Sequence, residues 1–162
     1  MTIAQGDTLP DATFLKFGDA GPEEVALADL TKGRKVVLFG LPGAFSRTCS
    51  ASHLPSFIRT KDAFGAKGVD DIICVAVNDP FVMASWGEAT GAHAAGLHLL
   101  ADPASEFTRA IGMEFDAPPV GFHGRCKRFA MVVEDGKVTL LHAEENPGVC
   151  EVSGGEAVLD AM

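Results

Sequence analysis

The chain of 162 residues lacks any long apolar run. Its longest apolar segments, such as Ile72 to Val77, are far shorter than the roughly 20 residues that a membrane-spanning helix requires. The opening residues, MTIAQGDTLPD, contain neither the basic region nor the apolar stretch of a signal peptide. Repeats, linkers and low-complexity tracts are also missing. We therefore expect one domain over residues 1–162, in a cytoplasmic protein that does not bind membranes.

Positive charge and paired cysteines are scarce as well. Only 13 basic residues stand against 22 acidic ones, and the net charge of −9 argues against nucleic acid as a partner. None of the four cysteines forms a C-x-x-C motif, which argues against a zinc knuckle and a two-cysteine thioredoxin motif. The histidines at positions 93, 98, 123 and 142 have no spacing that suggests a metal site.

The pattern along the chain predicts strands alternating with helices. Apolar runs predict strands over 13–17, 24–27, 35–39, 71–77, 97–101, 128–133 and 138–142. Capping and stop signals predict helices over 48–64, 80–90 and 105–111, and a last helix that begins with the capping box of Ser153 and Glu156. Pro55 predicts a kink near His53 or Leu54 in the first of these helices. The expected fold is α/β and thioredoxin-like, with a mixed central sheet flanked by helices and an N-terminal β-hairpin.

One cysteine lies where a loop enters a helix, in the segment LFGLPGAFSRTCSASHLPSF at 38–57. Ser46, Thr48 and Ser50 offer hydroxyls that can cap this helix, which places Cys49 in or beside its first turn. Free backbone N–H groups and the helix dipole favour a thiolate there. Cys49 is therefore expected to be a reactive thiol.

Three segments carry a resemblance to a known family: PGAFSRTCSASHLPSF, VAVNDPFVMASW and KRFAMVVEDG. Together they resemble the peroxiredoxins, specifically the type II or peroxiredoxin-5-like branch, over nearly the whole chain. The pattern P-x-x-x-T/S-x-x-C of that branch is met by Pro42, Ser46 and Cys49, and its distant arginine by Arg128. The resemblance implies a thiol-dependent peroxidase that reduces hydrogen peroxide and organic hydroperoxides without metal, haem or flavin.

The resemblance also assigns a task to each motif residue. Cys49 attacks the peroxide, Arg128 and Ser46 hold and polarise it, and Pro42 shields the thiolate. The alternative is a thioredoxin-like redox sensor or binding module that signals through oxidation of Cys49. The two differ in turnover, since a sensor stops after one equivalent of peroxide.

Two residues of the loop depart from the usual family form, and one neighbour is ambiguous. Ser46 replaces the commoner threonine, which removes a methyl group but keeps the hydroxyl. Arg47 replaces a proline, and its charge either favours the thiolate or faces solvent. His53 lies one turn after Cys49 and is interpreted as a structural or supporting group rather than as half of a Cys/His pair.

The thiol that regenerates Cys49 is left open by the sequence. Cys150, in the loop NPGVCE, and Cys74, in the core-like run ICVAV, are candidate resolving cysteines, whereas Cys126 is interpreted as a packing residue. The default is a one-cysteine cycle, in which glutathione with glutaredoxin, thioredoxin or another external thiol attacks the oxidised sulfur. The resemblance further implies a homodimer, to which Phe45 or Phe81 would contribute.

Overall fold

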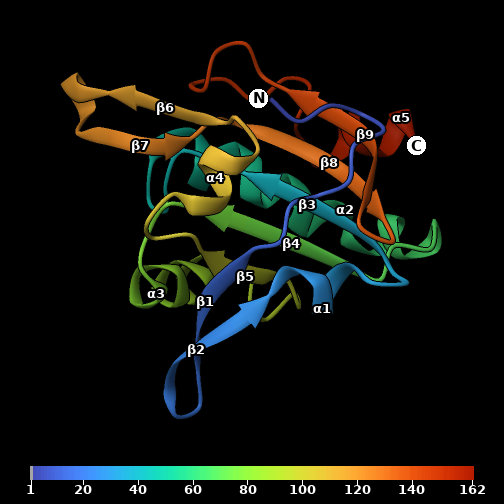
Figure 1. Ribbon diagram of the computed structural model, residues 1–162, viewed down its shortest axis with the longest axis horizontal. Coiled ribbons are helices and arrows are strands. Elements are labelled where there is room, and N and C mark those ends of the chain that lie inside the picture. Colours follow the sequence, from blue (N-terminus) through green and yellow to red (C-terminus); the bar gives the residue numbers. More distant parts are fainter. Residues whose placement is uncertain (1) are drawn as a thin grey trace.

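A seven-stranded mixed sheet forms the centre of the computed structural model, which describes residues 2–162 (Figure 1). Its strands lie in the order β2-β1-β5-β4-β3-β8-β9. They are β1 (Thr13–Gly18), β2 (Gly21–Ala26), β3 (Lys35–Gly40), β4 (Asp71–Ala76), β5 (His98–Ala101), β8 (Phe129–Glu134) and β9 (Lys137–Ala143). Strands β3, β4 and β5 are parallel, and the remaining pairs are antiparallel. The mixed sheet and the N-terminal hairpin of β1 and β2 confirm the predicted architecture.

Helices cover both faces of this sheet because its central strands are apolar on both sides. Successive side chains of a strand point to opposite faces, so Val37 and Phe39 enter one core while Val36 and Leu38 enter the other. The first core is closed by α2 (Leu54–Ala66), α3 (Pro80–Thr90) and α5 (Gly155–Ala161), and the second by α1 (Leu27–Thr31) and α4 (Glu106–Ala110). Across residues 2–162, every helix is too short or too polar to traverse a bilayer.

The helix that follows β3 begins irregularly. Its first part, η1 (Cys49–His53), is a π-helical turn in which the N–H of Leu54 donates to the carbonyl of Cys49, five residues back. Regular α-helix starts only at Leu54, next to Pro55, which has no N–H to donate. The irregularity predicted near His53 and Leu54 is thus confirmed, in the form of a wider turn.

A second, two-stranded sheet was not predicted from the sequence. It consists of β6 (Glu114–Ala117) and β7 (Phe122–Cys126), joined by the short 3₁₀ turn η2 (Pro118–Val120). Figure 1 shows this hairpin projecting from one end of the molecule. Arg128 lies in the link from β7 to β8, immediately before the strand in which it was expected.

The capping box predicted for the last helix is wrong. The Ser153 hydroxyl donates to a carboxylate oxygen of Glu144 at 2.6 Å, and Glu156 pairs with Arg59 at 2.6 Å. Helix α5 instead begins after Gly154 with no side-chain cap. The hydroxyl prefers a carboxylate acceptor because a charge-assisted hydrogen bond is stronger than a neutral one.

Candidate active site

Cys49 lies buried beneath the loop that leaves the centre of the sheet. Strand β3 ends at Gly40, and residues 41–48 carry the chain to the first residue of η1. The Cys49 side chain is fully buried, and its Sγ accepts a hydrogen bond from Nη2 of Arg128 at 3.1 Å. A guanidinium N–H aimed at sulfur favours the thiolate, because it stabilises the charged form and not the neutral one.

Three separate bonds fix the guanidinium of Arg128, whose side chain is only 1% exposed. Its Nε donates to the Pro147 carbonyl at 3.0 Å, its Nη1 lies 3.0 Å from Nδ1 of His53, and its Nη2 contacts Cys49. No salt bridge joins it to a carboxylate within the described chain. The buried positive charge is therefore free to be balanced by an anionic sulfur, as a buried cation needs an anionic partner.

The hydroxyls of the loop serve other purposes than the helix capping predicted for them. The Ser46 hydroxyl donates to the Gly43 carbonyl at 2.7 Å, and the Thr48 hydroxyl donates to the Gly148 carbonyl at 2.8 Å. Ser50 accepts a hydrogen bond from the indole N–H of Trp86 at 2.9 Å. The capping prediction fails because carbonyl acceptors of the loop and of residue 148 lie within reach of these donors. Ser46 and Thr48 thereby shape the loop above Cys49.

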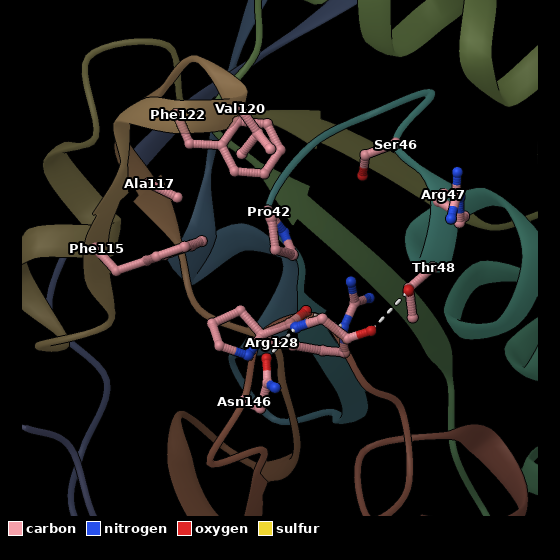
Figure 2. Close-up of a pocket in the computed structure, with 12 residues that line it drawn as sticks. Pro42, Ser46, Arg47, Thr48, Phe115, Ala117, Val120, Phe122, Arg128 and Asn146 are labelled. Carbon is pink, nitrogen blue, oxygen red and sulfur yellow. Dashed lines mark hydrogen bonds between the residues drawn. The ribbon is translucent and has the colours of Figure 1, made fainter.

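A cavity of about 560 Å³ adjoins Arg128, the residue that donates a hydrogen bond to the sulfur of Cys49 (Figure 2). Figure 2 shows Pro42 and Arg128 between two walls, one from the β6–β7 hairpin and the other from the start of the helix. The lining residues are Pro42, Ser46, Arg47, Thr48, Phe115, Ala117, Val120, Phe122, Arg128, Asn146, Pro147 and Gly148. The structure thus brings Pro42, Ser46 and Arg128 together around one hollow, with Cys49 buried beside them. Arg47 is an exposed residue of the rim.

The other three cysteines lie in less reactive surroundings, and all four are free thiols. Cys74 faces Phe39 across β3 and β4, and burial raises the pKa of its thiol well above the usual value. Burial also raises the pKa of Cys126 to about 12, and this thiol donates to the Lys127 carbonyl at 3.2 Å. Cys150 is only half-buried, although burial still raises its pKa.

His53 contacts the arginine rather than the cysteine. Its ring is fully buried, with Nδ1 facing Arg128 and Nε2 at 3.0 Å from the Ser153 carbonyl. Burial, followed by the charge of Arg128, lowers the pKa of His53 to about 3. The histidine is therefore neutral at physiological pH, in agreement with its interpretation as a supporting group.

Sequence reasoning missed the residues that reach the site from other elements. Pro147 and Gly148 supply carbonyls from the loop before α5, and Arg125 of β7 donates to the Pro42 carbonyl at 3.0 Å. The dipeptide Asn146-Pro147 signals a turn, but nothing in it indicates which side chains the turn will meet. Throughout residues 2–162, no three His, Cys, Asp or Glu side chains cluster as metal ligands would.

A buried thiol held against a guanidinium, at the head of the helix after a central strand, defines a thiol-based oxidoreductase. The family model described as Redoxin matches residues 4–159. The chain is 48% identical to the chloroplastic peroxiredoxin-2E-2 of Oryza sativa subsp. japonica, over 99% of this chain and 73% of that protein. It is 41% identical to peroxiredoxin-2B of Arabidopsis thaliana, over 99% and 98% of the two chains.

Solved structures agree with these relatives. Reduced Prx3 of Vibrio vulnificus in complex with H2O2 superposes with a TM-score of 0.91 at 46% identity, over 99% of both chains. Peroxiredoxin 5 of Alvinella pompejana gives a TM-score of 0.85 at 33% identity, over 98% of this chain and 97% of that one. The chain belongs to the peroxiredoxins, in their type II branch, and has their thioredoxin-like fold. It is an antioxidant thiol-dependent peroxidase, with a peroxide as substrate and a thiol as reductant.

Proposed function

We propose that Cys49 is the residue that attacks the peroxide, with Arg128, Ser46 and Pro42 as its immediate partners. The observation that carries this assignment is the 3.1 Å hydrogen bond from Arg128 to the buried sulfur. Of the four thiols, Cys49 is the one that receives a hydrogen bond from a cation, whereas burial raises the pKa of the other three. A thiolate is the nucleophilic form of cysteine, so this environment selects Cys49.

The first chemical step is a displacement on oxygen. The thiolate of Cys49 attacks one peroxide oxygen, a sulfur–oxygen bond forms, and the oxygen–oxygen bond breaks. Sulfur loses two electrons and becomes a sulfenic acid, and the far oxygen leaves as hydroxide or alkoxide and takes a proton from water. Substrates are hydrogen peroxide and organic hydroperoxides, whose organic groups fit the apolar wall formed by Phe115, Val120 and Phe122.

The neighbours of Cys49 position this reaction. Arg128 lines the cavity and touches the sulfur, so its N–H groups can hold a peroxide and stabilise the charge that develops on it. The Ser46 hydroxyl, already oriented by the Gly43 carbonyl, presents its oxygen to the same hollow. Pro42 is buried and keeps water away from the thiolate, because its ring carries no polar group.

We assign the reducing step to an external thiol in a one-cysteine cycle. Cys74 of β4 and Cys126 of β7 are both buried, and a disulfide from either to Cys49 would require local unfolding. Glutathione therefore attacks the sulfenic sulfur and releases water, and glutaredoxin with a second glutathione returns Cys49 to the thiol. Thioredoxin is the alternative donor. Cys150 is the second choice as a resolving residue, because it lies half-exposed in a loop.

Replacement of Cys49 by serine tests the assignment of the nucleophile. We expect Cys49→Ser to abolish steady turnover of hydrogen peroxide with glutathione and glutaredoxin, because serine has no thiolate to oxidise. Turnover is measured by the NADPH consumed when glutathione reductase recycles the oxidised glutathione. Cys126→Ser is the matched control and should keep the rate, whereas wild-type turnover in Cys49→Ser would refute the assignment.

Intact mass of peroxide-treated protein distinguishes a one-cysteine cycle from one with a resolving cysteine. The one-cysteine cycle predicts a sulfenic acid on Cys49 in wild type, and a mixed disulfide once glutathione is added. A disulfide that disappears in Cys150→Ser or Cys74→Ser would instead identify that cysteine as the resolving residue.

Two further assignments follow from the environment of the site. A homodimer that pairs through the loops around the active site is supported by Phe45 and Phe81, whose side chains are 56% and 60% exposed. Sedimentation of wild type beside a Phe45→Ser, Phe81→Ser double variant tests it. Four free cysteines support a reducing compartment such as the cytoplasm.

A further inference from the structure

We propose that His53 is a positioning residue for peroxide reduction: as a neutral imidazole it holds the guanidinium of Arg128 in the orientation that directs one N–H at Cys49. This inference rests on the roles proposed above for Cys49 and Arg128. It gives the reaction a participant that touches neither the peroxide nor the sulfur.

The hydrogen bonds of His53 determine which nitrogen carries its proton. Nε2 lies 3.0 Å from the carbonyl of Ser153, which can only accept, so the proton is on Nε2. Nδ1 then presents a lone pair, and Nη1 of Arg128 donates to it at 3.0 Å. The Ser153 carbonyl therefore fixes the tautomer that the arginine needs.

The surroundings of the ring keep it neutral and prevent it from turning. Phe39 of β3 and Phe57 of α2 pack against it with ring centroids 5.0 and 5.6 Å away. Arg128, the charged group facing it, repels a second positive charge, and burial acts in the same direction, which agrees with the lowered pKa of about 3. The carboxylate of Glu144 accepts a hydrogen bond from the N–H of Ser153, whereas the imidazole is bonded to the carbonyl of Ser153 and not to Glu144.

The guanidinium is rigid and planar, so fixing two of its nitrogens sets the direction of the third. The Pro147 carbonyl holds Nε and His53 holds Nη1, which leaves Nη2 directed at Sγ of Cys49. Without the acceptor at Nδ1, a buried N–H loses its partner, and the guanidinium turns to find another. Cys49 then loses part of its hydrogen bond and of the stabilisation of its thiolate.

Two substitutions of His53 distinguish its hydrogen bond to Arg128 from a role in packing alone. In His53→Asn the side-chain oxygen takes the place of Nδ1 and keeps an acceptor for Arg128. In His53→Gln the longer amide takes the place of Nε2 and keeps the bond to Ser153, but offers Arg128 no acceptor. Both amides are smaller than imidazole and both stay neutral across the pH range.

The readout is the second-order rate constant for hydrogen peroxide between pH 4 and 9, followed by rapid quenching and intact mass. We expect His53→Gln to lower this constant at pH 7 about tenfold, the order of a lost hydrogen bond to a charged group. Its pH profile should also shift to higher pH. His53→Asn should stay within about threefold of wild type with an unshifted profile, because its oxygen keeps the bond to Arg128.

Phe57→Leu is the structural control, since Phe57 packs against the imidazole but makes no hydrogen bond to it. It should lower the melting temperature and leave the midpoint of the pH profile in place. Equal shifts in His53→Gln and His53→Asn, or no shift in either, would overturn the positioning role. Undiminished turnover in Cys49→Ser would instead overturn the proposed nucleophile, so the two failures are distinguishable.

Discussion

At the scale of the residue, one acceptor can organise a loop that reaches the active site. Oε2 of Glu144 accepts hydrogen bonds from the N–H groups of Glu151, Val152 and Ser153 at 2.8–2.9 Å. The Ser153 hydroxyl adds a fourth bond at 2.6 Å. In the same loop, between β9 and α5, the Pro147 carbonyl accepts a hydrogen bond from Arg128 and the Ser153 carbonyl accepts one from His53. Glu144 therefore holds the segment whose Ser153 carbonyl binds His53, the histidine that contacts Arg128.

Replacement of Glu144 by glutamine should weaken this loop. Burial alone would raise the pKa of Glu144, but the hydrogen bonds from Ser153, Glu151 and Val152 outweigh it and lower the pKa below the ordinary 4.5. A lowered carboxyl pKa stabilises the fold above pH 4.5, and this contribution is lost as the pH falls through the folded-state pKa. We expect Glu144→Gln to lower the free energy of unfolding at pH 7 by about 1–3 kcal/mol, and to flatten its acid dependence.

Urea unfolding at several pH values measures both effects. Glu145→Gln is the matched control, because Glu145 is exposed and has the same charge. Equal losses in the two variants would show that net charge, and not the hydrogen bonds of Glu144, is responsible.

At the scale of the element, the sequence predicted what apolar runs and strong stop signals control. Strands β3 and β4 are continuous apolar segments, and α3 begins at Pro80 and ends at Thr90, before Gly91, as predicted. The β6–β7 hairpin escaped prediction because its strands are short, half-exposed and separated by two prolines. The capping box failed because the Ser153 hydroxyl binds the carboxylate of Glu144, nine residues earlier, which no helix-start pattern takes into account.

The contact between α2 and α5 gives an element-scale prediction. A Cβ added at Gly155 would lie 2.5 Å from the backbone oxygen of Ser56, and the N–H of Gly155 donates to the Ser56 hydroxyl at 2.8 Å. We expect Gly155→Ala to push the helices apart and to lower the free energy of unfolding by about 1–3 kcal/mol. Chemical denaturation measures this loss.

Gly65→Ala, in helix α2, should have the opposite effect on stability. A Cβ at Gly65 meets nothing within 4 Å, so alanine should stabilise α2 by up to about 1 kcal/mol. Similar effects of the two substitutions would contradict the close approach of α5 to α2 at Gly155.

At the scale of the whole molecule, the charge of the cavity is opposite to that of the protein. The chain carries a net charge of −9, yet the charged residues that line the cavity are Arg47 and Arg128. Arg128 is buried on Cys49, whereas Arg47 stands exposed at the rim, at the other side of the cavity from the apolar wall. An apolar wall facing a cationic rim matches a hydroperoxide with a hydrocarbon chain and an anionic end.

Arg47→Gln should therefore change selectivity among organic hydroperoxides. We expect wild type to prefer linoleic acid hydroperoxide to its methyl ester in kcat/KM, and the variant to lose up to about fivefold of that preference, the limit for an exposed ion pair. Added salt should weaken the preference of wild type. Lys32→Gln is the control. It also removes one exposed positive charge, but Lys32 precedes the start of β3, whereas the loop of the site follows the end of that strand. An unchanged ratio in Arg47→Gln would mean that Arg47 only faces solvent.

The candidate site was predictable where its residues belong to one local motif. Pro42, Ser46 and Cys49 lie within eight consecutive positions, 42–49. Arg128 lies far from them in the sequence and was predicted only from the resemblance to the family. The bonds of His53 to Arg128 and to Ser153 join residues 75 and 100 positions apart. Such pairs depend on the register of whole elements, and no local pattern encodes that register.

These long separations also bear on which parts of the fold the site needs. The bonds from Arg128 to Cys49, from Thr48 to Gly148 and from His53 to Ser153 all close back onto the first third of the chain. The segment up to β8 contains Cys49 and Arg128, but neither the Pro147 carbonyl that binds the arginine nor the Ser153 carbonyl that binds His53. The placement of Arg128 against Cys49 therefore requires the loop before α5 to be folded onto the start of α2.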